Sequence, residues 1–168
     1  MKNFVIALVM CSIGGALSAS SAYASNTSNV EKIKALEDKF VAAVNAKDID
    51  AIMSIYVPDE SLLVFDLAPP LQYVGAKAYR KNWQDFVATM GPVRFEVTDF
   101  TVAVDGKMAY SHAVHHLTAT DNNGQKLDWT VRVSDVYQKI KGQWLIVHEH
   151  VSVPIDLATG KPDFASKP

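Results

Sequence analysis

The sequence predicts an α+β domain, with helices in the first part of the chain and a strongly curved antiparallel sheet in the second. Apolar residues recur at helical spacing up to Gly91-Pro92 and alternate with a period of two afterwards. The chain has 168 residues, of which 49% are hydrophobic and 20% charged, which suits one globular domain and excludes a disordered or collagen-like chain. The formal net charge of −2 gives no basic surface for nucleic acid.

Residues 1–24 have the pattern of a secretory signal peptide. Lys2 supplies a positive start, residues 4–17 form an apolar run too short to span a bilayer, and Ala22-Tyr23-Ala24 is a typical cleavage pattern. We expect cleavage after Ala24 and a secreted or periplasmic protein that has no membrane partner once the signal is removed. The mature chain then has no cysteine, because Cys11 is the only one. A buried first helix is the alternative, and the Ser/Ala/Asn stretch after the apolar run disfavours it.

Three helices are expected before the sheet. The first carries its apolar face over residues 30–45. The second follows Asp48, a good N-cap residue, and stops at Pro58. The third covers residues 75–90, with aromatic and apolar side chains on one face.

The remaining elements are predicted to be strands. Asp-Gly, Asn-Asn-Gly and Lys-Gly sequences separate the four long strands and are hairpin signals. We expect strands at residues 62–66, 94–104, 107–120, 126–139 and 143–153, and a short extended piece at residues 71–74. Without repeats or a second-domain boundary, one domain covers residues 25–154 and an exposed tail covers residues 155–168. The long strands should curl around the helices and enclose a pocket.

Asp66 is a candidate general base. It ends the apolar stretch of residues 62–66, and if its carboxyl group faces an apolar cavity, burial raises its pKa. The alternative, which the spacing alone favours, is a turn aspartate that accepts hydrogen bonds from the following backbone amides.

Asp135 interrupts an apolar strand pattern. It alternates with Trp129, Val133 and Tyr137, and a buried carboxyl group needs a partner or stays protonated. The alternative is an ion pair with an arginine such as Arg94.

Glu149 interrupts the last strand in the same way. It alternates with Val147 and Val151, and both sets of alternating positions in this strand are half apolar. The other set holds Trp144, Ile146, His148 and His150. Either set could therefore face the interior.

The histidines all fall on the predicted strands. His112 and His116 share one strand face, and His115 points to the other. A metal site built from His112, His116 and Glu149 is one possibility, but such histidines are more often structural, so no metal ligand is assigned. No nucleophile, phosphate-loop or dinucleotide motif is present, so no cofactor is expected.

Three stretches resemble the ketosteroid isomerase/SnoaL-like superfamily, which shares the cone-shaped fold of nuclear transport factor 2. They are residues 40–50, Val64-Phe65-Asp66 and residues 142–152, and the resemblance extends over residues 30–154. The last stretch also resembles the association domain of calmodulin-dependent kinase. The resemblance implies a cone with three N-terminal helices on the curved sheet and a pocket between them.

The resemblance also implies roles for single residues. Asp66 matches the general base of the isomerases, and Asp135 matches the protonated aspartate of their oxyanion hole. Phe40 stands where they place the tyrosine that completes this hole, so one hydroxyl donor is missing. His116 is similar in position to a pocket-lining basic residue of the kinase domain, and His112 on the same face would join it.

The same resemblance places Glu149 towards the cone interior and His148 and His150 on the outer face. With Trp144 and Ile146 assigned to that outer face, it is too apolar for a solvated surface and predicts a homodimer. The expected pocket is lined by Phe40, Tyr56, Asp66, Trp83, Phe86, His112, His116, Trp129, Asp135 and Glu149.

Two functions follow as hypotheses. The first is a cofactor-independent isomerase, cyclase or dehydratase in which Asp66 abstracts a proton next to a carbonyl group, Asp135 donates a hydrogen bond to the enolate, and His112 or His116 acts as an acid. The second is a non-catalytic protein that binds a small ligand. A metal-binding protein is the third possibility.

Overall fold

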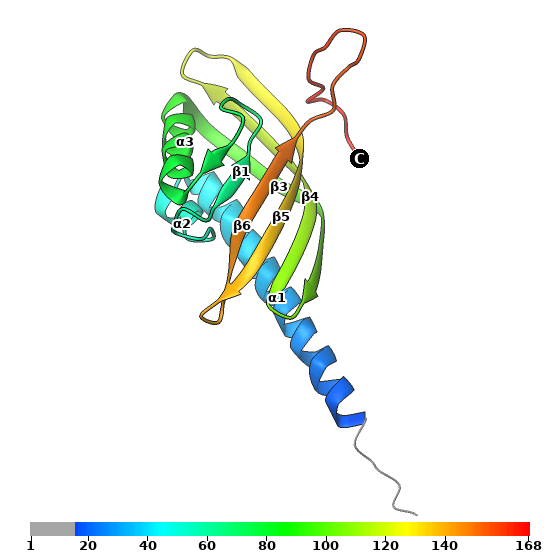
Figure 1. Ribbon diagram of the computed structural model, residues 1–168. Helices are drawn as coiled ribbons and strands as arrows, with labels where there is room; N and C mark the ends of the chain where they lie inside the picture. The colour runs from blue at the N-terminus through cyan, green and yellow to red at the C-terminus, as the bar shows by residue number, and fades with distance from the viewer. Residues whose placement is uncertain (1–15) are drawn as a thin grey trace, which may run out of the picture.

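The computed structural model describes residues 16–168 of the chain (Figure 1). The signal-peptide prediction lies largely outside the described residues and stays a prediction. The helices are α1 (Ala16–Ala46), α2 (Ile49–Met53) and α3 (Ala76–Thr89). α1 begins at Ala16 rather than near Val30, so it runs through the predicted cleavage site. As expected, Asp48 caps α2, because its side chain accepts a hydrogen bond from Ala51 N at 3.0 Å.

The sheet has six strands in the order β2-β1-β6-β5-β4-β3. The strands are β1 (Leu63–Phe65), β2 (Tyr73–Val74), β3 (Met90–Asp105), β4 (Met108–Asp121), β5 (Lys126–Ile140) and β6 (Gln143–Ser152). The α+β class is confirmed, with helices first and a meander of long antiparallel strands second. The sheet is mixed, however, because β1 pairs with β6 in parallel. The whole meander separates β1 from β6 along the chain, so no hairpin fixes their relative direction.

β3 begins earlier than the sequence predicts. Gly91 and Pro92 belong to the strand instead of separating it from α3. β3 lies at the edge of the sheet, where a proline, which has no backbone N–H, is tolerated.

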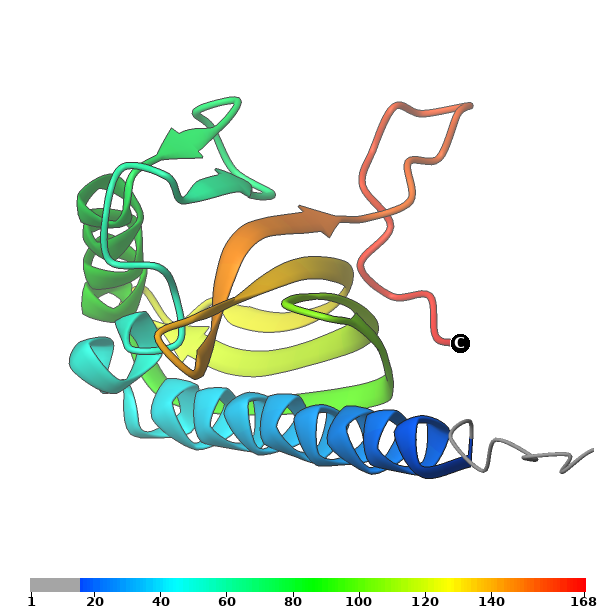
Figure 2. The same ribbon diagram turned by 60° about the horizontal axis from the view of Figure 1, so that its bottom comes forward.

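The sheet curves over the helices (Figure 2). α1 lies along its concave side, and α3 and the β1–β2 pair close one end. Irregular pairing within β3, between Thr98 and Thr101, and within β6 accompanies this curvature. The core between α1, α2 and the sheet includes Ile33, Val44, Ile52, Val64 and Tyr137.

A β-bulge at Val147 corrects the expected faces of β6. Val136 pairs with His148 but Tyr137 pairs with Ile146, so Val147 is an extra residue in β6. The alternation of the strand shifts by one position there. As a result, the even-numbered residues Trp144 and Ile146 before the bulge lie on the same face as Glu149 after it. Trp144 and Ile146 are therefore only 4% and 2% exposed and belong to the core, not to the outer face.

The C-terminal tail is largely exposed, and its end folds back onto β5. β6 ends opposite Arg132, and beyond that point Thr130 N donates a hydrogen bond to Phe164 O at 3.0 Å. The ring of Phe164 stacks on Trp129 with ring centres 5.1 Å apart. Within the described part of the chain, no helix combines the length and the apolar character needed to cross a membrane.

Candidate functional site

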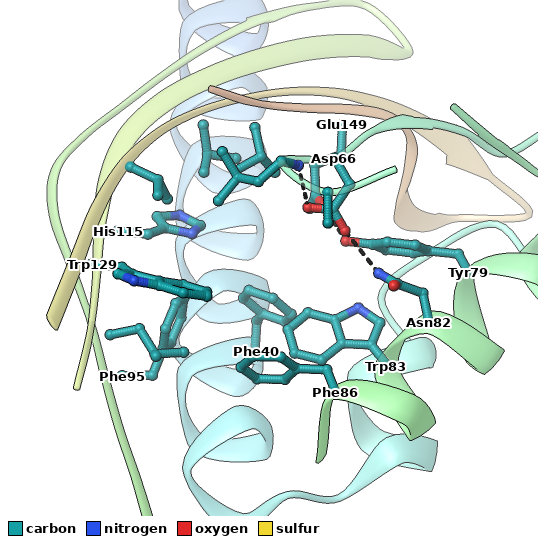
Figure 3. A pocket seen from close by; sticks show the side chains of 16 residues that line it. Phe40, Asp66, Tyr79, Asn82, Trp83, Phe86, Phe95, His115, Trp129 and Glu149 are labelled. Carbon is teal, nitrogen blue, oxygen red and sulfur yellow. Dashed lines mark hydrogen bonds between the residues drawn. The ribbon is translucent and has the colours of Figure 1, made fainter. Parts of the chain in front are cut away.

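The concave side of the sheet holds a cavity of about 220 Å³ (Figure 3). Its walls come from α1, α3, the segment after β1 and the inner face of β3 to β6. The apolar side chains of the wall are Phe40, Leu67, Ala68, Trp83, Phe86, Phe95, Leu117, Trp129, Val131, Val133 and Val151. The polar side chains are Asp66, Tyr79, Asn82, His115 and Glu149.

The structure brings together a large part of the set that the sequence predicts. Phe40, Asp66, Trp83, Phe86, Trp129 and Glu149 all line the cavity. Tyr56 and Asp135 are buried but do not reach its wall, and His112 and His116 lie on the outer side of the sheet.

The inner face of β4 carries His115, which corrects the prediction for its two neighbours. Ser111, Ala113 and His115 are buried, while the alternate positions face outwards. His116 makes an exposed contact with Asp128 at 2.7 Å instead of lining the pocket. A metal site formed by His112, His116 and Glu149 is wrong as well, because Glu149 lies on the inner face of the sheet.

Asp66 lies where β1 ends and is partly buried. Its Oδ1 accepts a hydrogen bond from Leu67 N and its Oδ2 accepts one from Asn82 Nδ2, both at 2.7 Å. Burial raises the pKa of Asp66 above its usual value, and the two hydrogen bonds only partly oppose this. Asp66 thus both faces the cavity and bonds the next backbone amide, so the two alternatives considered for it coexist.

Glu149 is bound by two tyrosines. Tyr79 donates to Oε1 at 2.5 Å, and Tyr56 donates to Oε2 at 2.7 Å. Burial raises the pKa of Glu149 to about 7, against the lowering effect of these two hydrogen bonds. Tyr56 therefore supports the site through Glu149 rather than as part of the wall.

Asp135 is buried behind the cavity wall. Ser111 and Tyr137 donate to its Oδ2 at 3.3 Å each, and its Oδ1 has no partner among residues 26–168. Burial and the nearby Glu149 and Glu37 raise its pKa well above its usual value, which favours the neutral acid. The alternative pairing with Arg94 is wrong, because Arg94 binds Glu96 at the surface.

Glu37 of α1 and His115 of β4 form a buried pair that is absent from the sequence predictions. Glu37 Oε1 lies 3.5 Å from His115 Nε2, and both side chains are buried. Burial, with the charges of Glu149 and Asp38, raises the pKa of Glu37 to about 7. Burial lowers the pKa of His115 to about 4, so the imidazole is neutral at neutral pH.

A signal for Glu37 was present in the sequence. Glu37 lies four residues after Ile33 and three before Phe40, which places a carboxyl group inside the apolar stripe of the first helix. Within residues 26–168 no group of potential ligands has the arrangement of a metal site.

The arrangement suits proton transfer on an uncharged, mostly apolar molecule. Asp66 offers a carboxylate with a raised pKa on one side of the cavity, and His115 with Glu37 offers a neutral pair that can pass a proton on another (Figure 3).

Comparison with known proteins agrees with this architecture. A family model described as a SnoaL-like domain matches residues 33–156. No curated protein matches the chain. An NTF2-like (nuclear transport factor 2-like) protein of unknown function from Pseudomonas putida is similar in structure, with 30% sequence identity and a TM-score of 0.76. That match covers 84% of this chain and 98% of the other.

Two further solved structures share the fold at low identity. A candidate scytalone dehydratase from Novosphingobium aromaticivorans has 13% identity and a TM-score of 0.70, covering 86% of this chain and 99% of the other. A candidate dehydratase of the NTF2-like family from Streptomyces avermitilis has 16% identity and a TM-score of 0.67, covering 76% and 97%.

Proposed function

Because this chain belongs to the SnoaL-like domain family, with the NTF2-like fold, we propose that it binds a small, uncharged, largely apolar carbonyl compound and moves a proton on it without a cofactor. The observation that carries the proposal is Asp66, a carboxylate with a raised pKa at the wall of an otherwise apolar cavity. The site supports a proton-transfer isomerase, cyclase or dehydratase.

The first step would be removal of a proton from the carbon next to the carbonyl group. Asp66 takes this proton, the electrons of the C–H bond form a C=C bond, and the carbonyl oxygen becomes an enolate. In an isomerase, Asp66 returns the proton to another carbon. No electron acceptor is needed in either step.

A dehydratase needs an acid for the leaving hydroxyl group, and His115 is suited to this. The enolate electrons re-form the C=O bond and a C=C bond to the neighbouring carbon, whose C–O bond breaks, and the hydroxyl group leaves as water with the proton of His115 Nδ1 while Glu37 gives a proton to Nε2. After the product leaves, Nδ1 regains a proton from solvent, the Nε2 proton returns to Glu37, and solvent takes the proton from Asp66. The two similar structures that are candidate dehydratases favour this variant of the proposal.

Solvent deuterium exchange tests the proposal without knowledge of the natural substrate. We expect the protein in D₂O to exchange the protons next to the carbonyl group of a small ring ketone such as indanone, as followed by proton NMR. Asp66→Asn should lose this exchange, and Asp85→Asn, at an exposed position bonded to Lys81, should keep it. Exchange that persists in Asp66→Asn, or no exchange while indanone is bound, would contradict the proposal.

A non-catalytic binding protein is the second candidate. Both oxygens of Asp66 already accept hydrogen bonds, and Phe40 brings no hydroxyl group to the cavity. Native mass spectrometry discriminates the two: an unmodified small molecule that stays bound through purification would favour binding alone.

We also propose that residues 1–24 direct export to the periplasm or beyond. The apolar run and the Ala-Tyr-Ala sequence support this. The mass of the exported protein should correspond to a chain that begins at Ser25, and an intact N-terminus would contradict the proposal.

A further inference from the structure

Several hydrogen-bond donors around the cavity are already bonded to its carboxyl groups. Tyr79 donates to Glu149, and both Leu67 N and Asn82 Nδ2 donate to Asp66. Among the described residues, two buried nitrogen atoms of the wall have no partner, Trp83 Nε1 and His115 Nε2. His115 Nε2 faces Glu37, which leaves Trp83 Nε1 as the buried donor of the wall that has no hydrogen-bond partner.

The Trp83 ring is held in place by aromatic neighbours. It makes edge-to-face contacts with Phe40, Tyr79 and Phe86, with ring centres 5.8, 6.2 and 6.0 Å apart. Figure 3 shows its nitrogen on the ring edge turned towards Tyr79 and Asn82, at the end of the cavity where Asp66 lies. A buried N–H without a partner is unfavourable and rare in folded proteins.

Trp144, which lies in the core, has a hydrogen-bond acceptor for its indole nitrogen. Trp144 Nε1 donates to Asn29 Oδ1 at 3.3 Å. Trp83 has no such internal acceptor, although its ring is fixed as firmly.

We propose that Trp83 Nε1–H is the hydrogen-bond donor that binds the oxygen of the carbonyl compound in this cavity. An indole nitrogen can only donate, so its ligand must bring an acceptor. Asp66 and Glu149 line the same cavity, and they disfavour an anionic ligand. A neutral carbonyl oxygen meets both conditions. The inference rests on the proposed function for the nature of the ligand.

The same bond would assist the chemistry. When Asp66 removes the proton, negative charge develops on the carbonyl oxygen, and a fixed N–H at that oxygen stabilises the charge more than it stabilises the neutral ligand. Phe40 lacks the hydroxyl group that the resemblance associates with this task, and Trp83 is in direct ring contact with Phe40. Trp83 supplies a donor in that neighbourhood.

The cavity volume limits the ligand to one or two rings. An apolar cavity of about 150 Å³ binds benzene, and this cavity measures about 220 Å³. Indanone, a ketone fused to a benzene ring, fits this class, and indane is the same ring system without the oxygen.

The test compares the affinities of indanone and indane by calorimetric or NMR titration. The preference for indanone, expressed as the ratio of the two dissociation constants, should fall about two- to tenfold in Trp83→Phe. Trp129→Phe is the matched control, since it removes another indole from the same wall whose nitrogen lies at the ring end away from Trp83 and Asn82 (Figure 3), and it should leave the ratio unchanged.

The infrared C=O stretch of bound indanone gives a second readout that packing alone does not move. It should lie at lower frequency in the unmodified protein and in Trp129→Phe than in Trp83→Phe. An unchanged ratio and an unchanged C=O band in Trp83→Phe would overturn the inference, as would failure of the unmodified protein to bind indanone. If the binding preference depends on Trp83 but no deuterium exchange occurs, the inference stands and the proposed catalytic function fails.

Discussion

Three buried carboxyl groups, those of Glu37, Asp135 and Glu149, influence one another inside this protein. No lysine or arginine of residues 26–168 forms an ion pair with them. Hydroxyl groups of tyrosine and serine bind two of them instead, and burial raises the pKa of all three. A pocket next to such groups can store and release protons near neutral pH.

The raised pKa of Glu37 predicts a specific dependence of stability on pH. Its pKa is about 7 in the folded protein and about 4.5 when unfolded, so folding favours the protonated form. The stabilising contribution is complete below about pH 4.5 and is lost as the pH rises to above about 7. Relative to Glu37→Gln, the unmodified protein should therefore lose on the order of 1–3 kcal/mol of unfolding free energy between about pH 5 and about pH 8.

Urea unfolding of both proteins at the two pH values measures this difference. The contribution of His115 has the opposite sign, because its pKa is lowered to about 4, and it largely cancels in the comparison. A free-energy difference that is the same at both pH values would show that Glu37 titrates as a solvated side chain.

Single residues also mark the limit of what the sequence can predict. Asp66 was found because it ends an apolar strand and matches a known motif, and it does line the cavity. The resemblance to the kinase association domain implies His116 instead of His115, and the strand pattern does not correct this choice, because histidines stand on both faces of β4. The packing of β4 against α1 decides that choice, and a single strand does not encode it.

Among the elements, β6 shows why register is the difficult part. Regular alternation assigned Trp144 and Ile146 to the outer face, but the bulge at Val147 brings them into the core with Glu149. The apolar residues on both faces of this strand were the visible trace of the bulge. Element types and most boundaries were predictable, since they follow from hydrophobic periodicity and turn residues.

The C-terminal tail is the element whose contacts the sequence did not indicate. Phe164 stacks on Trp129, so the tail contacts one residue of the cavity wall. Phe164→Ala should cost about 0.5–1.5 kcal/mol of the stability of this attachment and release the tail, so that the Thr130 amide proton, which is bonded to Phe164 O, exchanges faster with solvent deuterium. Leu157→Ala, at a side chain that is 96% exposed, should leave this exchange unchanged. Equal exchange at Thr130 in Phe164→Ala and in the unmodified protein would mean that the stack does not hold the tail.

For the whole molecule, a homodimer that forms through the outer face of the sheet stays a prediction, but different residues now support it. Without Trp144 and Ile146, the exposed apolar side chains on the outer face of β4 are Tyr110, which is 56% exposed, and Met108, which is 44% exposed, while Val114 and Val136 beside Tyr110 are half-buried. We expect a homodimer in light scattering at micromolar concentration and a monomer for Tyr110→Lys. A dimer that survives Tyr110→Lys unchanged would place the interface elsewhere, and a monomeric unmodified protein would contradict the prediction.

The pH profile of ketone deuterium exchange tests the central claim most directly, because it identifies the base. For a bound ketone such as indanone, the exchange rate should rise with pH as Asp66 ionises and then level off. Its midpoint should lie above the usual aspartate pKa of 3.8, since burial raises the pKa of Asp66. Asp66→Asn should abolish this rise. A rate that increases with hydroxide concentration alone, with the same profile in Asp66→Asn, would show that the cavity binds the ketone without acting on it.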